Sequence, residues 1–195
     1  LLALDAALAR EPTEQNIEEV WAIVDRDRFL DYMAWEAVAR QQDGYRQGNN
    51  WRLFIDCAGL RVEWVPSGAD FSWTYGEVRG VVALEPGAFL EGLPPGVGGR
   101  AFRYCVAVPS CRRDYARHVL RLIDLAESIE LREKFEALSA RLESCIASDP
   151  KSTFDSAAVR EANRATRAAL TDGLAALREA VRAEYPDLDA SRAGH

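Results

Sequence analysis

The stretch DGYRQGNNWRLFIDCAGLRVEWVPSGADFSWTYG, residues 43–76, decides how the middle of this chain folds. Two short runs within it, WRLFID (51–56) and LRVEWV (60–65), roughly alternate apolar and polar side chains. Such alternation is typical of β-strands, and Ala58-Gly59 between the runs can supply a tight turn. The stretch therefore predicts a two-stranded antiparallel hairpin.

Polar residues stand at the open end of this predicted hairpin. Asn50 directly precedes the first run, Asp70 follows the second, and Asp43 lies on the loop that leads into the first. A hairpin brings both of its ends to one edge, so Asn50 and Asp70 should approach each other. We expect two acids and an amide to converge at this point.

Helical periodicity dominates the sequence on both sides of the hairpin. Upstream, it predicts helices in residues 1–9, 14–24 and 27–42. Downstream, residues 71–102 are rich in Gly and Pro and predict an irregular connection with room for one more short strand. From Pro109 onward three further helices are predicted, with apolar positions at Tyr115, Val119, Leu122 and Ala126, then Leu131, Phe135, Leu138, Leu142 and Cys145, then Leu170, Leu174, Leu177 and Val181.

The predicted fold class is α+β and mainly α, with a small antiparallel sheet packed among helices. At 195 residues and 48% hydrophobic content, the chain can bury a sizeable core as a single domain. Within it, residues 1–108 are expected to carry helices, the hairpin and the candidate site. Residues 109–187 form a helical part, and residues 188–195 a frayed tail.

Charge and hydropathy exclude some classes of function. The net charge of −7 argues against a nucleic-acid-binding role driven by a basic surface. No apolar run approaches the length of a membrane span, and the first residues do not have the pattern of a signal peptide. Because the chain begins at Leu1 rather than Met, we expect a fragment or a processed product.

The four cysteines, Cys57, Cys105, Cys111 and Cys145, are too far apart for a metal knuckle such as C-x-x-C, so zinc is not expected. Cys105 and Cys111 flank the short segment VAVPS and could close a small disulfide loop in an oxidising compartment. Buried free thiols are an equally good interpretation of the sequence.

The order Asp, Asn, hairpin, Asp is the order that a kinase-type phosphoryl-transfer site needs. One Asp orients or accepts the proton of the substrate hydroxyl, and the Asn and the second Asp hold the metal. Oxygen ligands of this kind suit magnesium. The alternative is local: Asp43 could cap a turn with Gly44, Asn49 and Asn50 could be turn residues, and Asp70 could pair with an Arg.

Beyond these spacings, the chain resembles the spore-coat protein H (CotH) kinase family, atypical protein kinases that phosphorylate secreted or surface proteins. The resemblance rests on FLDYMAWEAVARQQDGYRQGNNWRLF (29–54) and VEWVPSGADFSWTYG (62–76). The segments CRRDYARHVLRLID, SDPKSTF and REANRATRAAL are similar to the helical part of the family, with less specific motifs. The resemblance covers most of the chain.

The resemblance implies roles for four residues. Asp43 matches the catalytic Asp, Asn50 or its neighbour Asn49 the metal-binding Asn, and Asp70 the metal-binding Asp. It further implies the C-lobe of an atypical kinase, Mg²⁺ and ATP as cofactors, and a protein substrate phosphorylated on Ser or Thr. An extracellular or cell-envelope location is also implied, so Cys105 and Cys111 should be close enough to bridge.

Two departures from the family pattern leave other functions open. Many members have Pro-Trp-Asp-x-Asp where this chain has PSGAD (66–70), so Gly68 replaces one acid. Residues 1–42 contain no lysine and no Gly-rich loop, so the nucleotide-gripping lobe is expected to be missing and the fragment alone inactive. The alternatives are a pseudokinase or non-catalytic envelope or adhesion module on the same fold, and an acidic helical interaction domain unrelated to kinases.

Overall fold

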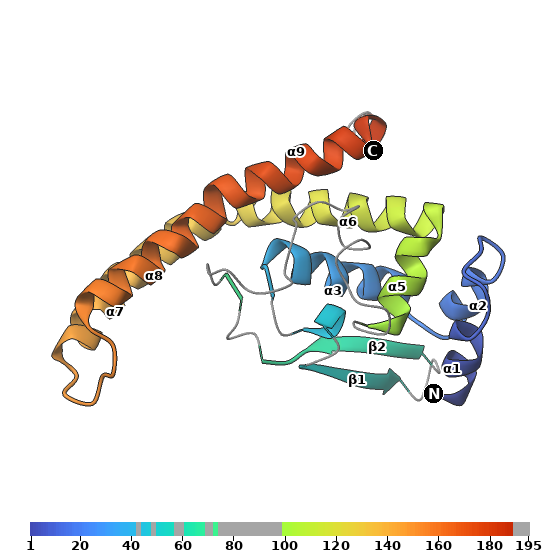
Figure 1. The fold of residues 1–195 in the computed structure, drawn as a ribbon, viewed down its shortest axis with the longest axis horizontal. Coiled ribbons are helices and arrows are strands. Elements are labelled where there is room, and N and C mark those ends of the chain that lie inside the picture. The colour runs from blue at the N-terminus through green and yellow to red at the C-terminus, as the bar shows by residue number, and fades with distance from the viewer. Residues whose placement is uncertain (42–43, 48–49, 57–60, 69–71, 74–98, 189–195) are drawn as a thin grey trace.

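The computed structural model describes residues 1–41, 44–47, 50–56, 61–68, 72–73 and 99–188. Within them the chain is mainly helical with one two-stranded antiparallel sheet, which confirms the α+β, mainly α prediction (Figure 1). The elements are α1 (Leu2–Leu8), α2 (Ile17–Trp21), α3 (Arg26–Val38), η1 (Tyr45–Gln47), β1 (Trp51–Asp56), β2 (Arg61–Pro66), α5 (Arg100–Ala107), α6 (Pro109–Ser128), α7 (Leu131–Ser148), α8 (Ser156–Ala168), η3 (Ala169–Gly173), α9 (Leu174–Glu184) and η4 (Pro186–Leu188). No described helix has the length and apolar character required to span a membrane.

The predicted antiparallel hairpin is present, with its second strand one residue later than the predicted run 60–65. Strands β1 and β2 pair antiparallel from Trp51 opposite Pro66 to Asp56 opposite Arg61, and the predicted turn at 58–59 lies outside the described residues. Trp64 of β2 is buried, and its ring centroid lies 4.8 Å from that of Phe29 on α3. The sheet is therefore held against the helices through the inner face of β2.

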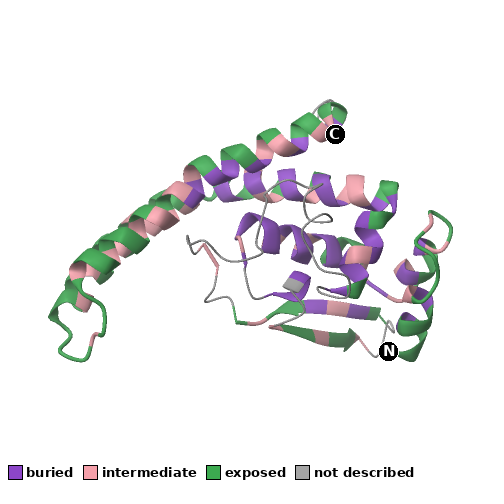
Figure 2. Cartoon of the chain, viewed as in Figure 1, coloured by how far each residue is buried: buried purple, intermediate pink, exposed green. Residues whose placement is uncertain are grey.

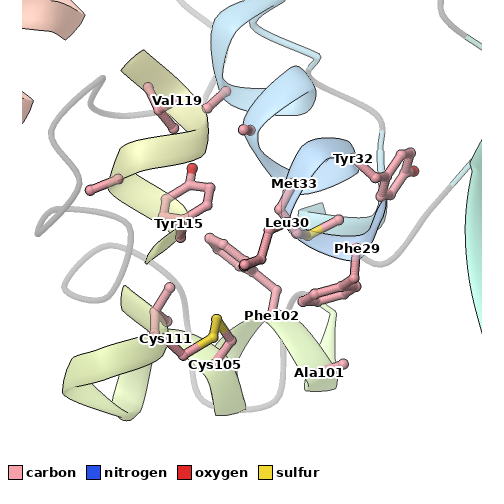
Figure 3. Packing of buried hydrophobic residues seen from close by; sticks show 14 of the residues in the cluster. Phe29, Leu30, Tyr32, Met33, Ala101, Phe102, Cys105, Cys111, Tyr115 and Val119 are labelled. Atoms are coloured by element: carbon pink, nitrogen blue, oxygen red, sulfur yellow. A yellow bond between two sulfur atoms is a disulfide. The ribbon is translucent and has the colours of Figure 1, made fainter. Parts of the chain in front are cut away.

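Helix α3 is the central element of the core. It begins where the Asp25 side chain accepts a hydrogen bond from the backbone N–H of Arg28 (3.1 Å), which is an N-cap. Its apolar residues pack against α6, and Figure 3 shows Leu30 next to Phe102 of α5 in the core. The helix ends at Val38, earlier than the predicted residue 42, and Arg40 has a left-handed φ of 51°.

Helix α5 was not predicted, because residues 71–102 were expected to be irregular. Its residues Arg100–Ala107 form a short helix with Phe102 and Cys105 in the core. Val108 is extended, as is usual before a proline, and Pro109 opens α6 at a position where its missing N–H costs nothing. Two helices therefore stand where the sequence predicted a connection and one helix.

The expectation that Cys105 and Cys111 lie close enough to bridge is confirmed. A disulfide joins them across the α5–α6 corner, with the Cα atoms 5.3 Å apart and both residues buried (Figure 3). Cys145 on α7 is a free, exposed thiol.

Removing this disulfide with a Cys105→Ala, Cys111→Ala double variant is expected to lower the free energy of unfolding by about 2 kcal/mol, since the closed loop is short. In a domain of this size that corresponds to a fall in melting temperature of roughly 4–8 °C. Thermal unfolding with and without reductant measures the effect, and Cys145→Ala is the matched control. Equal melting temperatures in both conditions would contradict the prediction.

Helices α7 and α8 form an antiparallel pair that extends away from the rest of the molecule (Figure 1). Neither helix contains a buried residue (Figure 2), and ion pairs such as Arg167 to Glu136 join them. The helical prediction is correct for α7, but Leu138 and Leu142 of its predicted apolar face are exposed. Helix α8 continues through the π-helical turn η3 into α9, which packs on α6.

Candidate functional site

Of the four predicted site residues, the structure describes Asn50. Asp43, Asn49 and Asp70 lie outside the described residues, so the structure neither brings them together nor separates them. The neighbours of these residues in the chain are described, and they define the surroundings of the site.

Three segments that carry the predicted site residues meet at Gly68. Asn50 directly precedes β1 with a left-handed φ of 42°, a conformation that Asn adopts more readily than most residues. Its side chain lies against Gly68, where a Cβ would be only 2.9 Å from the Asn50 Nδ2. Gln41 Nε2 donates a hydrogen bond to the Gly68 carbonyl oxygen (2.8 Å). Residues two positions before Asp43 and two before Asp70 are thus joined beside Asn50.

A buried carboxylate lies next to Gln41, one of the residues of this junction. Glu36 of α3 is fully buried; its Oε1 accepts from the backbone N–H of Tyr45 (2.5 Å), and its Oε2 from that of Arg46 (3.0 Å). The Arg46 guanidinium is also buried, with Nε 3.3 Å from the same Oε2. The pair is charge-assisted and shielded from solvent, so it holds the start of η1 on α3.

Tyrosine hydroxyls surround the buried pair and remain protonated. Burial raises the pKa of Tyr115 to about 12 and that of Tyr45 to about 12, with the Glu36 charge adding to both. Burial and Glu36 also raise the pKa of Tyr32. The Tyr45 oxygen accepts a hydrogen bond from the N–H of Ala101 (3.0 Å), which ties η1 to α5.

The segment that follows Asp70 is tied to the helices. The N–H of Trp73 donates to the Ala39 carbonyl at the end of α3 (2.8 Å), and the Thr166 hydroxyl of α8 donates to the Trp73 carbonyl (3.4 Å). Nearby, the Arg40 guanidinium lies so close to Gly173 of the π-helical turn that a Cβ there would be 2.7 Å from it. The base of the α7–α8 pair therefore contacts the end of α3 and the chain after Asp70.

The donor types of the predicted site fit a hard cation. Asn50 offers an amide oxygen, and the predicted partners Asp43 and Asp70 are carboxylates, the ligand class that magnesium prefers. Among the described residues, no group of three or more His, Cys, Asp or Glu could hold a metal ion. Both predicted carboxylates, Asp43 and Asp70, lie outside the described residues.

Sequence reasoning missed Glu36, Gln41 and Arg46. One signal was available: Glu36 follows Met33 by three positions on a helix whose neighbouring residues are nearly all apolar. A carboxylate at such a position is buried only with partners. Two of the partners, the N–H groups of Tyr45 and Arg46, are main-chain groups and leave no trace in the sequence, and the Arg46 side chain does not by itself show that it pairs with Glu36.

Comparison with known proteins tests the resemblance. The family model described as CotH kinase protein matches residues 1–183 of the 195-residue chain. None of the curated proteins matches it in sequence. Because the family match extends through the hairpin, the helices around it and nearly all of the C-terminal helical part, the chain belongs to the CotH kinase family.

Proposed function

We propose that this protein takes part in Mg-ATP-dependent phosphoryl transfer to Ser or Thr of a secreted or surface protein. Asp43 is the catalytic acid-base group, and Asn50 and Asp70, with Asn49 as the alternative amide, would hold Mg²⁺. The family assignment supports a kinase, and the types of donor support the metal.

The observation that carries the proposal is the junction at Gly68. Gln41, Asn50 and Gly68 come from three separate segments, and each segment leads within two residues to a proposed site residue or contains one. The hairpin by itself accounts for the contact between Asn50 and Gly68, but the hydrogen bond from Gln41 adds the segment that leads to Asp43, which a hairpin does not require.

In the proposed reaction, the oxygen of the substrate hydroxyl attacks the γ-phosphorus of ATP. Asp43 takes the proton of that hydroxyl, the bond between the γ-phosphorus and the bridging oxygen breaks, and ADP leaves. Magnesium, when bound, would neutralise part of the phosphate charge. The described residues would position one of its ligands, because Asn50 lies against Gly68, which accepts a hydrogen bond from Gln41.

We also propose that residues 1–187 form one domain that corresponds to the C-lobe of an atypical kinase, with 188–195 as its tail. Residues 1–42 contain no lysine, so the nucleotide-gripping Lys must come from another part of the protein. An extracellular or cell-envelope location is supported by the buried Cys105–Cys111 disulfide, because such bonds persist in oxidising compartments.

A pseudokinase, or an adhesion module on the same fold, is the second candidate, and Gly68 favours it. Gly68 stands where many family members carry an acid, and its φ of 63° and the Asn50 amide against it make any side chain there strained. The left-handed backbone conformation at position 68 therefore favours glycine over an acid. Family membership counts against the interpretation as an acidic helical domain unrelated to kinases.

The test is made on the full-length protein. Calorimetric titration with Mg-ATP measures nucleotide binding, and transfer of labelled γ-phosphate to Ser- or Thr-containing surface proteins measures activity. Binding and transfer together support the kinase, binding without transfer supports the pseudokinase, and the absence of both supports the adhesion module.

Gly68→Ala is expected to destabilise the protein by about 1–2 kcal/mol, because a Cβ is unfavourable in the left-handed region. The added Cβ would also push the Asn50 side chain away, since it would lie 2.9 Å from Nδ2. Chemical denaturation measures the free energy of unfolding, and Ser67→Ala is the neighbouring control. A Gly68→Ala protein as stable as the control would contradict the described conformation.

A further inference from the structure

We propose that Glu36 is a positioning residue for Asp43, holding both ends of the loop 41–46 on helix α3. This inference rests on the proposed function, because it gives Glu36 a role in the phosphoryl-transfer step through Asp43. Neither the family match nor the sequence assigns a role to Glu36.

Glu36 accepts hydrogen bonds from residues at both ends of the segment 41–46. At the entry, the N–H of Gln41 donates to the backbone carbonyl of Glu36 (2.9 Å). At the exit, the carboxylate accepts from the N–H groups of Tyr45 (2.5 Å) and Arg46 (3.0 Å). Arg46 Nη2 donates a hydrogen bond to the Glu36 carbonyl oxygen (3.1 Å), the same oxygen that accepts from the Gln41 N–H. The described residues on either side of Asp43, Gln41 before it and Tyr45 and Arg46 after it, therefore all hydrogen-bond to a single residue.

The fit between Glu36 and the loop is also steric. A Cβ on Gly44 would lie 2.2 Å from Glu36 Oε1 and 2.6 Å from its carboxyl carbon. A residue with a side chain would therefore displace the Glu36 carboxylate, so this position requires glycine. Gly44 is the residue bonded directly to Asp43. The path of the backbone next to the proposed catalytic acid is thus set by the position of one carboxylate.

The described residues on either side of Asp43 make further contacts with other segments. Gln41 is buried, and its side chain donates to Gly68, which carries the contact with Asn50. The Tyr45 ring packs edge-on to Trp51 of β1, with ring centroids 5.2 Å apart. Two of the residues that hydrogen-bond to Glu36, Gln41 and Tyr45, therefore also contact the segments that carry the proposed metal ligands.

Energetics favour a positioning role over simple core filling. Removing two charges from water is costly, and apolar residues of similar volume often replace a buried ion pair without loss of stability. The neighbours of Glu36 on α3, such as Met33 and Ala37, are apolar, so an apolar residue would suit the helix. Unlike an apolar side chain, a carboxylate provides two acceptor oxygens for the consecutive N–H groups of Tyr45 and Arg46. The arrangement fixes geometry rather than maximising stability.

The test compares Glu36→Gln with Leu177→Ala in the full-length protein. Gln keeps the shape of Glu36 but loses its charge and one acceptor, while Leu177→Ala removes buried apolar volume from α9, far from the loop in sequence. We expect Glu36→Gln to lower kcat by roughly 10- to 100-fold, because small misplacements of catalytic groups have effects of this size. The Kd for Mg-ATP should stay within about twofold. Leu177→Ala should lower the melting temperature at least as much and leave kcat nearly unchanged.

A second readout covers the case in which Glu36→Gln folds poorly. Arg46→Lys keeps a positive charge beside Glu36, and the Glu36 carboxylate can still accept from the N–H groups of residues 45 and 46. The variant loses the hydrogen bond from Arg46 Nη2 to the Glu36 carbonyl oxygen, so kcat should fall only several-fold. Hydrogen exchange should show faster exchange of the Tyr45 and Arg46 amides in Glu36→Gln, with the Ile123 amide of α6 unchanged.

The inference fails if wild type is active and Glu36→Gln retains kcat within about twofold, or if its kcat falls no more than that of Leu177→Ala. If wild type binds Mg-ATP but transfers no phosphate, the proposed function itself fails. The two failures are therefore distinguishable.

Discussion

Replacing Asp43 by Asn is expected to lower the rate of phosphoryl transfer by about 10²- to 10⁴-fold, the usual contribution of a general acid-base group. Asn has nearly the same size as Asp but its amide cannot accept the proton of the substrate hydroxyl. The effect belongs to the chemical step, so the Kd for Mg-ATP should remain within about twofold of the wild-type value. A fall in kcat at constant binding is the pattern of an interaction made mainly in the transition state.

The measurement requires the full-length protein, with single-turnover transfer for the chemical step and calorimetry for nucleotide binding. Asp27→Asn is a matched control, because Asp27 is an exposed acid in the first turn of α3 and undergoes the same chemical change. If Asp43→Asn and Asp27→Asn transferred phosphate equally fast, Asp43 would return to the role of a turn residue beside Gly44.

The hairpin could be predicted from the sequence because its determinants are local. The alternation in residues 51–56 and 60–65 sets which side chains share a face, and the register from Trp51 opposite Pro66 follows from one short turn. The convergence of the two hairpin ends follows from the same geometry, and Asn50 does lie against the chain just after β2. The family resemblance could be recognised because its most specific motifs fall in this same stretch.

Helix α5 and the hydrogen bonds of Glu36 could not be predicted, because the residues that stabilise them are distant in the chain. Helix α5 is short, and its stability comes from Phe102 packing edge-on to Tyr115 and from the disulfide to α6. The carboxylate of Glu36 accepts from backbone N–H groups nine and ten residues further on, which any residue except proline can provide, and it also pairs with the Arg46 guanidinium. Periodicity detects which face of a helix is apolar, but not which main-chain groups approach it.

The exposed apolar positions of α7 show a third limit of sequence patterns. Leu138 and Leu142 stand at core-like spacing, yet the helix pairs with α8 through a different face that includes Glu136 and Glu143, which bind Arg167 and Arg160. The spacing correctly predicted a helix. It could not predict which face of that helix the neighbouring helix would cover.

Replacing Asp70 by Asn is expected to weaken Mg-ATP binding by about tenfold or more, which corresponds to at least about 1.4 kcal/mol. A carboxylate is a much better partner for a hard dication than an amide, and Gly68 stands where a second acid occurs in many family members. The sequence after β2 supplies only one acid, Asp70, where many family members have two, so no neighbouring carboxylate in that segment can take over. The loss should therefore be larger than in a site with two.

The measurement is calorimetric titration of the full-length protein with ATP at several magnesium concentrations. Raising magnesium should restore part of the lost affinity in Asp70→Asn, because the variant binds the metal less tightly and not the nucleotide itself. Transfer measured at saturating Mg-ATP should recover further than in Asp43→Asn, since the chemical group is intact. An Asp70→Asn protein with wild-type affinity at every magnesium concentration would remove Asp70 from the metal site, and Asn50 would then be held against Gly68 for the sake of the turn alone.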